Sequence, residues 1–361
     1  MDTTDPEIQF DSLGVCNHCH NYEKRASKEL FDNDEGGQML DRIASEIKKQ
    51  GNRKEYDCII GLSGGLDSSM VAYAVTKLGL RPLAVHLDNG WNSELSVANV
   101  ERIVKALKID LYTHIIDWEE FRDLQISFLK ASVINSEIPT DHAITALMYE
   151  SAARMGIKYI IGGGNIVTEA IMPKRWGYDP KDWKHIKAIH TRYGTSALRT
   201  YPHYSLTRFG YYLLIKRIKY VSILNYMPFR KTDAIALLGR EFGWRSYGDK
   251  HFESIFTRFF QGYILPTKFN IDKRKAHLST LICSGQMTRE EALQELGRNH
   301  YLDEQMQKDR DYVLKKLAMT SEEFEKIMAC PPKESEEYPT SYLLSRNFPW
   351  LMDLLRKVAK A

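Results

Sequence analysis

Short apolar segments alternate with amphipathic ones between residues 51 and 227. Each apolar segment is rich in Ile, Val and Leu and runs into a turn, as the strands of a buried parallel sheet do. We expect strands that end at residue 62 or span 83–87, 111–116, 158–161 and 220–224. Apolar residues between them recur at helical spacing and predict helices near 70–78, 97–107, 118–134 and 141–155. This alternation predicts an α/β fold with a doubly wound parallel sheet.

The pattern changes on both sides of this α/β region. Residues 28–50 predict an amphipathic helix that ends at Gly51, and residues 228–361 read as mostly helical. We therefore expect an N-terminal segment (1–50), an α/β domain (51–227) and a helical C-terminal region (228–361). Within the α/β domain, residues 166–219 interrupt the alternation.

This interruption has an unusual composition. It is rich in aromatic, basic and histidine residues: Lys174, Arg175, Trp176, Trp183, His185, His190, Arg192, Arg199 and His203. Such a segment could grip an anionic substrate or pack at a subunit interface. The sequence does not separate these two uses. If the segment packs at a subunit interface, the protein is a homo-oligomer.

Composition narrows the class of protein. The chain has 361 residues, of which 43% are hydrophobic and 27% charged, with a net charge of +3, as in ordinary globular proteins. This small charge does not favour a nucleic-acid partner, and no stretch approaches the ~20 apolar residues of a membrane span. The polar N-terminus is unlike a signal peptide. The sparse, odd set of cysteines fits a reducing cytoplasm: Cys16, Cys19, Cys58, Cys283 and Cys330.

Residues 57–69 (DCIIGLSGGLDSS) place a strand, a Gly/Ser turn and a helix in direct succession. Backbone N–H groups converge at the start of such a helix, where its dipole also favours an anion. Gly64 and Gly65 allow close backbone approach, and the serines add hydroxyl donors. The lysine of a kinase-type P-loop is missing.

The segment from Ser63 to Ser68 matches the S-G-G-x-D-S motif of the PP-loop ATP pyrophosphatases, the adenine nucleotide alpha hydrolase-like fold. The resemblance implies that this loop holds the pyrophosphate of ATP and that Asp67 binds Mg²⁺, a cation that prefers oxygen ligands. We therefore expect ATP-binding residues at Ser63, Gly64, Gly65, Leu66, Asp67, Ser68 and Ser69. A plain Gly/Ser turn with an Asp cap is the alternative.

Two further loops should lie at the same edge of the sheet, beyond the carboxyl ends of its strands. Asp88 follows the second strand and could hold the ribose or a metal, or be a turn residue beside Asn89-Gly90. Gly163, Gly164 and Asn165 follow the fourth strand and could approach the nucleotide closely, or form a simple turn.

Cys16-x-x-Cys19 is half of a zinc site. The missing ligands could be His18 and His20, or Cys283 and Cys330. A reduced, unligated pair is the alternative.

Late in the chain, ionisable groups crowd between apolar residues at 247–254, at Arg258 and at 268–275. An active-site wall needs such crowding. A helix N-terminus with a solvated face is the alternative.

Taken together, these motifs resemble the N-acetyl sugar amidotransferases, bacterial enzymes of surface-polysaccharide and nucleotide-sugar biosynthesis. The resemblance rests on residues 2–6, 10–11, 14–19, 57–69, 138–142, 162–165, 247–251, 256–259 and 268–274. In that family another cysteine pair precedes the 2–6 motif, and without it the zinc site would be incomplete.

The resemblance implies an ATP-dependent amidotransferase that converts the N-acetyl group of a UDP-linked sugar to an acetamidino group, in lipopolysaccharide O-antigen or related glycan synthesis. ATP adenylates the amide oxygen, and ammonia displaces AMP. Besides Asp67, the implied catalytic residues are Asp141, His142, Lys250 and His251, with Asp141 and His142 for proton transfer. Lys250, His251, Arg258, Lys273 and Arg274 would contact phosphate or a sugar acid, or form structural ion pairs instead.

The sequence shows neither an amino-terminal cysteine nucleophile nor a cysteine–histidine glutaminase domain. We therefore expect a separate glutaminase subunit to supply ammonia. A tRNA thiolation enzyme is the rival within the PP-loop class, but it would need reactive cysteines near the loop. A nucleotide-binding scaffold is the non-enzymatic rival, against which the intact loop argues.

Overall fold

The computed structural model describes residues 1–248, 250, 252–299 and 301–341. Its centre is a sheet in the order β3-β2-β1-β4-β5, and every neighbouring pair is parallel. The strands are β1 (Cys58–Gly61), β2 (Pro82–Asp88), β3 (Asp110–Ile115), β4 (Tyr159–Gly162) and β5 (Lys219–Ser222). The chain builds outward from β1 through β2 to β3, then returns to place β4 on the other side of β1. This topology confirms the doubly wound α/β fold expected from the alternation of elements.

Alternate residues of β1 enter the two hydrophobic cores on opposite faces of the sheet, as the period of a strand requires. Ile59 packs with the core that contains Phe121, Leu124 and Leu147. Cys58 and Ile60 pack with the other core, on the side of α2, α3, α4 and α10. Both faces are therefore covered, which is why β1 reads as a continuous apolar run.

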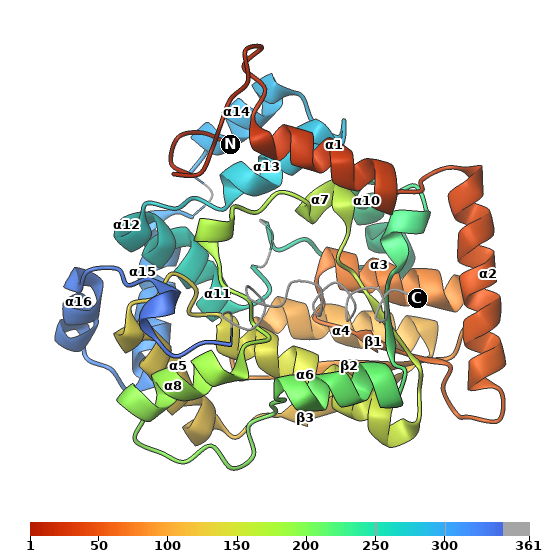
Figure 1. The fold of residues 1–361 in the computed structure, drawn as a ribbon, viewed down its shortest axis with the longest axis horizontal. Helices are drawn as coiled ribbons and strands as arrows, with labels where there is room; N and C mark the ends of the chain where they lie inside the picture. The colour runs from red at the N-terminus through yellow and green to blue at the C-terminus, as the bar shows by residue number, and fades with distance from the viewer. Residues whose placement is uncertain (249, 251, 300, 342–361) are drawn as a thin grey trace.

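Helices and short helical turns flank this sheet (Figure 1). Those up to β4 are α1 (Asn17–Glu29), α2 (Asp34–Gly51), α3 (Leu66–Lys77), α4 (Glu94–Leu107), α5 (Trp118–Ala131) and α6 (Ile138–Met155). Between β4 and β5 lie α7 (Ile166–Glu169), η1 (Lys174–Trp176), α8 (Trp183–Tyr193), α9 (Leu206–Gly210) and η2 (Tyr211–Ile215). After β5 come η3 (Ile223–Tyr226), α10 (Lys231–Phe242), α11 (Ile255–Phe259), η4 (Phe260–Ile264), α12 (Leu265–Phe269), α13 (Arg274–Cys283), α14 (Arg289–Gly297), α15 (Asp303–Leu317), α16 (Ser321–Ala329) and η5 (Ser335–Glu337).

The helix expected at 28–50 is two helices. α1 ends at Glu29, and α2 begins after Asn33, whose side chain accepts a hydrogen bond from the Gly36 N–H at 3.0 Å. This cap starts a new helix and breaks the one that the periodicity predicted. The helix expected at 118–134 likewise ends early, because Ser132 adopts a left-handed conformation.

The N-terminal segment lies against the C-terminal helices, although the two are far apart in sequence. α1 lies beside α13 in Figure 1, and Asp2 pairs with Lys275 at 2.6 Å. The expected division at residues 50 and 227 therefore stays a prediction. In the described part of the chain, no helix is long and apolar enough to cross a membrane.

Candidate functional site

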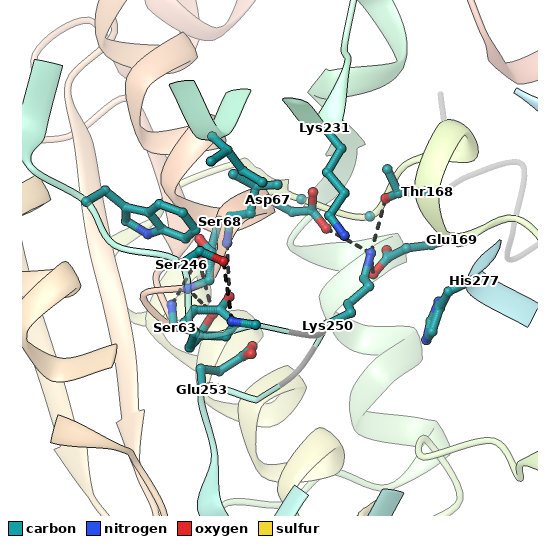
Figure 2. Close-up of a pocket in the computed structure, with 18 of the residues that line it drawn as sticks. Ser63, Asp67, Ser68, Thr168, Glu169, Lys231, Ser246, Lys250, Glu253 and His277 are labelled. Carbon is teal, nitrogen blue, oxygen red and sulfur yellow. Dashed lines mark hydrogen bonds and ion pairs between the residues drawn. The ribbon is translucent and has the colours of Figure 1, made fainter. Parts of the chain in front are cut away.

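A pocket of about 230 Å³ opens where the strand order reverses, between β1 and β4. Loops at the carboxyl ends of these strands supply one wall, and segments after β5 supply the other (Figure 2). Its lining residues are Ser63, Gly65, Leu66, Asp67, Ser68, Gly163, Gly164, Thr168, Glu169, Lys231, Ile235, Trp244, Ser246, Tyr247, Gly248, Lys250, Glu253, His277 and Leu281.

The loop between β1 and α3 is held tightly by its own hydroxyl groups. The Ser63 N–H donates to Ser68 Oγ at 3.3 Å, and the Gly65 N–H donates to Ser63 Oγ at 3.2 Å. Gly64 has φ +82°, and a Cβ there would lie 2.4 Å from the Ser96 carbonyl oxygen. Only glycine fits this position, because both its backbone angle and its close contact exclude a side chain.

Residues after α10 hold the same loop from outside. The Trp244 indole N–H donates to the Gly64 carbonyl at 3.0 Å, and the Leu66 N–H donates to the Tyr247 hydroxyl at 3.2 Å. Asn99 on α4 also donates to the Gly64 carbonyl, at 3.4 Å. Trp244 was missed by sequence reasoning, since nothing local marks a residue that acts on a loop so far away in the chain.

Lys250 bridges two carboxylates at the centre of the pocket (Figure 2). Its Nζ lies 3.0 Å from Asp67 Oδ2 and 2.8 Å from Glu169 Oε1, and it donates to Thr168 Oγ1 at 3.1 Å. Lys231 also points into this part of the pocket. The sequence singled out Asp67 and Lys250, but it assigned no role to Glu169 or Lys231.

Burial controls the ionisation of these groups. It raises the pKa of Asp67, and Glu169 adds to that effect while Lys250 opposes it. Burial alone would lower the pKa of Lys250, but the carboxylates of Asp67 and Glu169 outweigh it and raise that pKa. Burial, reinforced by the charges of Asp67 and Glu137, raises the pKa of Glu253 to about 7. The pocket therefore contains a lysine, Lys250, that stays protonated, and a carboxyl, Glu253, whose pKa lies near 7.

The loop after β4 approaches the first loop closely. A Cβ on Gly163 would lie 3.1 Å from Asp67, and Gly164 also lines the pocket. Asn165 caps α7 by accepting from the Thr168 N–H at 2.9 Å, which places Thr168 beside Lys250. Gly163 thus lies against the first loop, and Asn165 positions Thr168. A nucleotide contact for either residue stays a prediction.

Four of the expected ATP-binding residues lie outside the pocket lining: Gly64, Ser69, Asp88 and Asn165. Ser69 is fully buried in α3. Asp88 ends β2 and accepts from the Gly90 N–H at 2.9 Å, which is the turn role that the sequence left open. A nucleotide contact for any of these four residues stays a prediction without support from this geometry.

Asp141 and His142 begin α6, where Thr140 accepts from the Asn89 side chain at 3.1 Å. The Asp141 side chain reaches solvent, but the protein around its carboxyl partly desolvates it. This desolvation, together with Glu137, raises the pKa of the carboxyl to about 7, while Lys273 opposes the shift. His142 is fully buried. Its Nδ1 hydrogen-bonds the Pro180 carbonyl at 2.7 Å, and its Nε2 accepts from the Tyr204 N–H at 3.3 Å. Asp141 lies outside the pocket lining, so proton transfer by this residue stays a prediction. The buried and hydrogen-bonded ring of His142 has a structural role.

The basic residues expected to bind substrate are engaged with carboxylates. Arg258 forms a bidentate pair with Asp309 at 2.6 and 2.7 Å, and Arg274 pairs with Asp272 at 2.8 Å. Lys273 lies 3.6 Å from Glu137, and its positive charge opposes the rise in the pKa of Asp141. His251, expected to be catalytic, lies outside the described residues.

Three of the five cysteines gather between α1 and α13. Cys16 and Cys19 have their Sγ atoms 3.4 Å apart, and burial together with Cys19 raises the pKa of Cys283 to about 12. Cys330 is exposed at the end of α16, and His18 and His20 pair with Asp5 and Asp11. Within the described ranges, no group of three or more His, Cys, Asp or Glu side chains is arranged to hold a metal ion. Zinc therefore stays a prediction.

Comparison with known proteins gives two family matches. Residues 37–166 match the NAD synthase family, and residues 253–352 match the family described as LPS biosynthesis protein WbpG-like, C-terminal domain. No curated protein matches the sequence significantly.

Several solved structures are distant likenesses. The NMN synthetase of Francisella tularensis is 15% identical, covers 80% of this chain and 98% of its own, and has a TM-score of 0.37. The NH3-dependent NAD synthetase of Campylobacter jejuni, in complex with nitrate, is 16% identical over 72% of this chain and 96% of its own, with a TM-score of 0.33. A protein described as a predicted subunit of tRNA methyltransferase from Methanocaldococcus jannaschii is 17% identical over 50% of this chain and 74% of its own, with a TM-score of 0.30.

Each family match contributes residues to the pocket lining. The NAD synthase match covers Ser63–Ser68 and Gly163–Gly164, and the WbpG-like match covers Glu253, His277 and Leu281. The remaining lining residues, from Thr168 to Lys250, lie between the two matches. The chain therefore joins an NAD synthase-type PP-loop domain to a WbpG-like C-terminal domain, as expected of the PP-loop amidotransferase family of lipopolysaccharide biosynthesis.

Proposed function

We propose that the chain is an ATP-dependent amidotransferase that converts the N-acetyl group of a nucleotide-linked sugar to an acetamidino group. The observation that carries this proposal is the shared pocket. The PP-loop and the WbpG-like region line one space, so a nucleotide on the loop would face side chains of the region associated with lipopolysaccharide biosynthesis. Its product would enter O-antigen or a related surface glycan.

Chemistry requires two steps, because an amide carbon is a poor electrophile and an amide oxygen a poor leaving group. The amide oxygen attacks the α-phosphorus of ATP, and pyrophosphate leaves. The loop amides and the lysines Lys231 and Lys250 would stabilise the charge on the phosphate oxygens. Ammonia then attacks the activated carbon, and AMP leaves.

Asp67 and Glu169 suit Mg²⁺, which commonly takes one or two carboxylates together with substrate phosphates. Their carboxylates already share one cation, the Lys250 ammonium, so the pair forms a site for positive charge. When bound there, Mg²⁺ would neutralise charge on the phosphates.

Ammonia at neutral pH is mostly ammonium, so the second step needs a proton acceptor. Asp141 would serve, since its raised pKa makes it a base that accepts a proton near neutral pH. We propose that a separate glutaminase subunit supplies the ammonia. The tRNA thiolation alternative gains no support, because no cysteine is among the described residues that line the pocket.

The test is pyrophosphate release by the purified chain with ATP, Mg²⁺, an ammonium salt and a panel of UDP-linked N-acetyl sugars. We expect release that depends on one sugar, with AMP formed and one oxygen of that sugar replaced by NH in its mass. Asp67→Asn should abolish this release. Silence across the panel, with release restored by tRNA and a sulphur donor, would contradict the proposal.

A further inference from the structure

Tyr247 contacts the PP-loop at a group that a phosphate would use. The Leu66 N–H opens α3 and donates to the Tyr247 hydroxyl at 3.2 Å, while Gly65, the cap residue, offers no side chain. The first N–H groups of a helix have no partner within it and are the groups that bind phosphate. We propose that the Tyr247 hydroxyl stands in for a phosphate oxygen in the nucleotide-free protein and releases the Leu66 N–H to the pyrophosphate of ATP. This inference rests on the proposed function and adds Tyr247 to it as a residue that occupies the phosphate site until ATP binds.

The hydroxyl lies where an incoming phosphate oxygen would have to lie. A Cβ built on Gly65 would meet the Tyr247 hydroxyl at 2.9 Å, Ser63 Oγ at 3.1 Å and Glu253 Oε1 at 3.2 Å. Three oxygen atoms thus lie close over the loop at Gly65. Tyr247 also lines the pocket, so its hydroxyl occupies space that an incoming phosphate would need.

Repulsion between the Glu253 carboxyl and a bound anion would favour a change in this arrangement. Burial raises the pKa of the Tyr247 phenol, and its interaction with the Glu253 carboxyl raises it further. A pyrophosphate on the Leu66 N–H would meet that carboxyl, so the Tyr247–Glu253 contact and the anion compete for the same place. Because the pKa of Glu253 is raised to about 7, this carboxyl can take up a proton and relieve the repulsion.

The loop does not need Tyr247 in order to keep its shape. Trp244 and Asn99 both donate to the Gly64 carbonyl, and the hydroxyls of Ser63 and Ser68 hold the turn from within. Loss of the Tyr247 hydroxyl therefore frees the Leu66 N–H from its hydrogen-bond partner and leaves the loop in place. Trp244→Phe provides the matched comparison, since it removes a bond that shapes the loop but occupies no amide donor.

The experiment is calorimetric titration of the full chain with inorganic pyrophosphate, for the wild type, Tyr247→Phe and Trp244→Phe. We expect Tyr247→Phe to bind pyrophosphate roughly two- to ten-fold more tightly, because binding no longer breaks a neutral hydrogen bond. Trp244→Phe should bind more weakly. Unchanged or weaker binding by Tyr247→Phe would overturn the inference alone, whereas a wild type that binds neither pyrophosphate nor ATP would overturn the proposed function as well.

Hydrogen exchange of the wild type tests the same idea without a variant. Pyrophosphate should protect the amides of the PP-loop and expose those around Tyr247, residues 244–248. Greater protection of both segments would show that the tyrosine stays on the loop, and the inference would fail.

Discussion

The conformation of the PP-loop depends on Gly64, because no residue with a side chain fits at this position. It occupies left-handed backbone space and lies directly against the backbone of α4 at Ser96. An L-residue loses about 1–2 kcal/mol in that conformation before any contact is counted. The loop and the first turn of α4 would both have to shift to admit a methyl group.

Gly64→Ala should therefore lower both the stability of the protein and its affinity for pyrophosphate. We expect a loss of at least about 1–2 kcal/mol in the free energy of unfolding, measured by urea denaturation. Gly37→Ala is the control, because Gly37 lies within α2 with open space around it and gains helix propensity. Equal effects of the two substitutions would contradict this account of the loop.

The sequence predicts the role of some residues of the site but not of others. The role of Gly64 follows from its motif, because a tight strand-to-helix turn needs glycine. The partners of Arg258 and His142 do not follow from any motif. An arginine or a histidine can serve equally well in catalysis or in a buried structural contact. Only the packing of the folded chain decides which of the two roles it has.

At the scale of elements, a buried ion pair joins α11 to α15. Arg258 contacts Asp309 through two bonds, and Asp309 also accepts from Tyr301 and Gln305. Asp309 is 3% exposed, so removal of the guanidinium would leave a buried carboxylate with only neutral donors. Arg258 thus anchors the WbpG-like region through a structural ion pair, the alternative that the sequence left open beside substrate binding.

Arg258→Ala should lower the free energy of unfolding by about 3 kcal/mol, as expected when one partner of a buried pair is lost. The exposed pair of Arg298 and Glu295 is the control, where Arg298→Ala should cost less than about 1 kcal/mol. Urea denaturation of both variants makes the comparison. If Arg258→Ala instead keeps full stability and raises the KM for the sugar, the substrate role of this residue would be restored.

At the scale of the whole molecule, His185 lies where three parts of the chain meet. Its ring contacts Phe128 of α5 at 6.2 Å, Tyr178 before α8 at 4.5 Å and Tyr338 near the C-terminal end of the described chain at 6.0 Å, between ring centroids. Neither ring nitrogen has a hydrogen-bond partner within the described residues. Burial lowers the pKa of His185 from 6.5 to about 4, with only Asp182 opposing it.

A histidine whose pKa falls on folding stabilises the native state above its unfolded pKa and loses that contribution as the pH falls. His185 should therefore destabilise the protein between pH 6.5 and about 4, by up to about 1.4 kcal/mol for each pH unit. Carboxyl groups with raised pKa values, such as Glu253, act in the opposite direction over an overlapping range. A single variant is needed to separate the two effects.

His185→Phe should remove the acid sensitivity of this junction. Its stability relative to the wild type should rise when unfolding is measured at about pH 5 rather than about pH 7.5, because only the wild type takes up a proton on unfolding there. A constant difference for His185→Phe at both pH values would mean that the ring is not protonated on unfolding in this range.

The sequence by itself determined the parallel sheet, its strand positions within a residue or two and the Gly/Ser loop at the start of α3. These follow from local periodicity and turn chemistry, which act between residues close in the chain. Only the tertiary structure decided that Glu169, Lys231 and Tyr247 complete the site, that Arg258 binds Asp309 and that Cys283 joins the N-terminal cysteines. Such contacts join residues as far apart as Leu66 and Tyr247, 181 positions. They depend on how whole elements pack, and this packing leaves no periodic trace in the sequence.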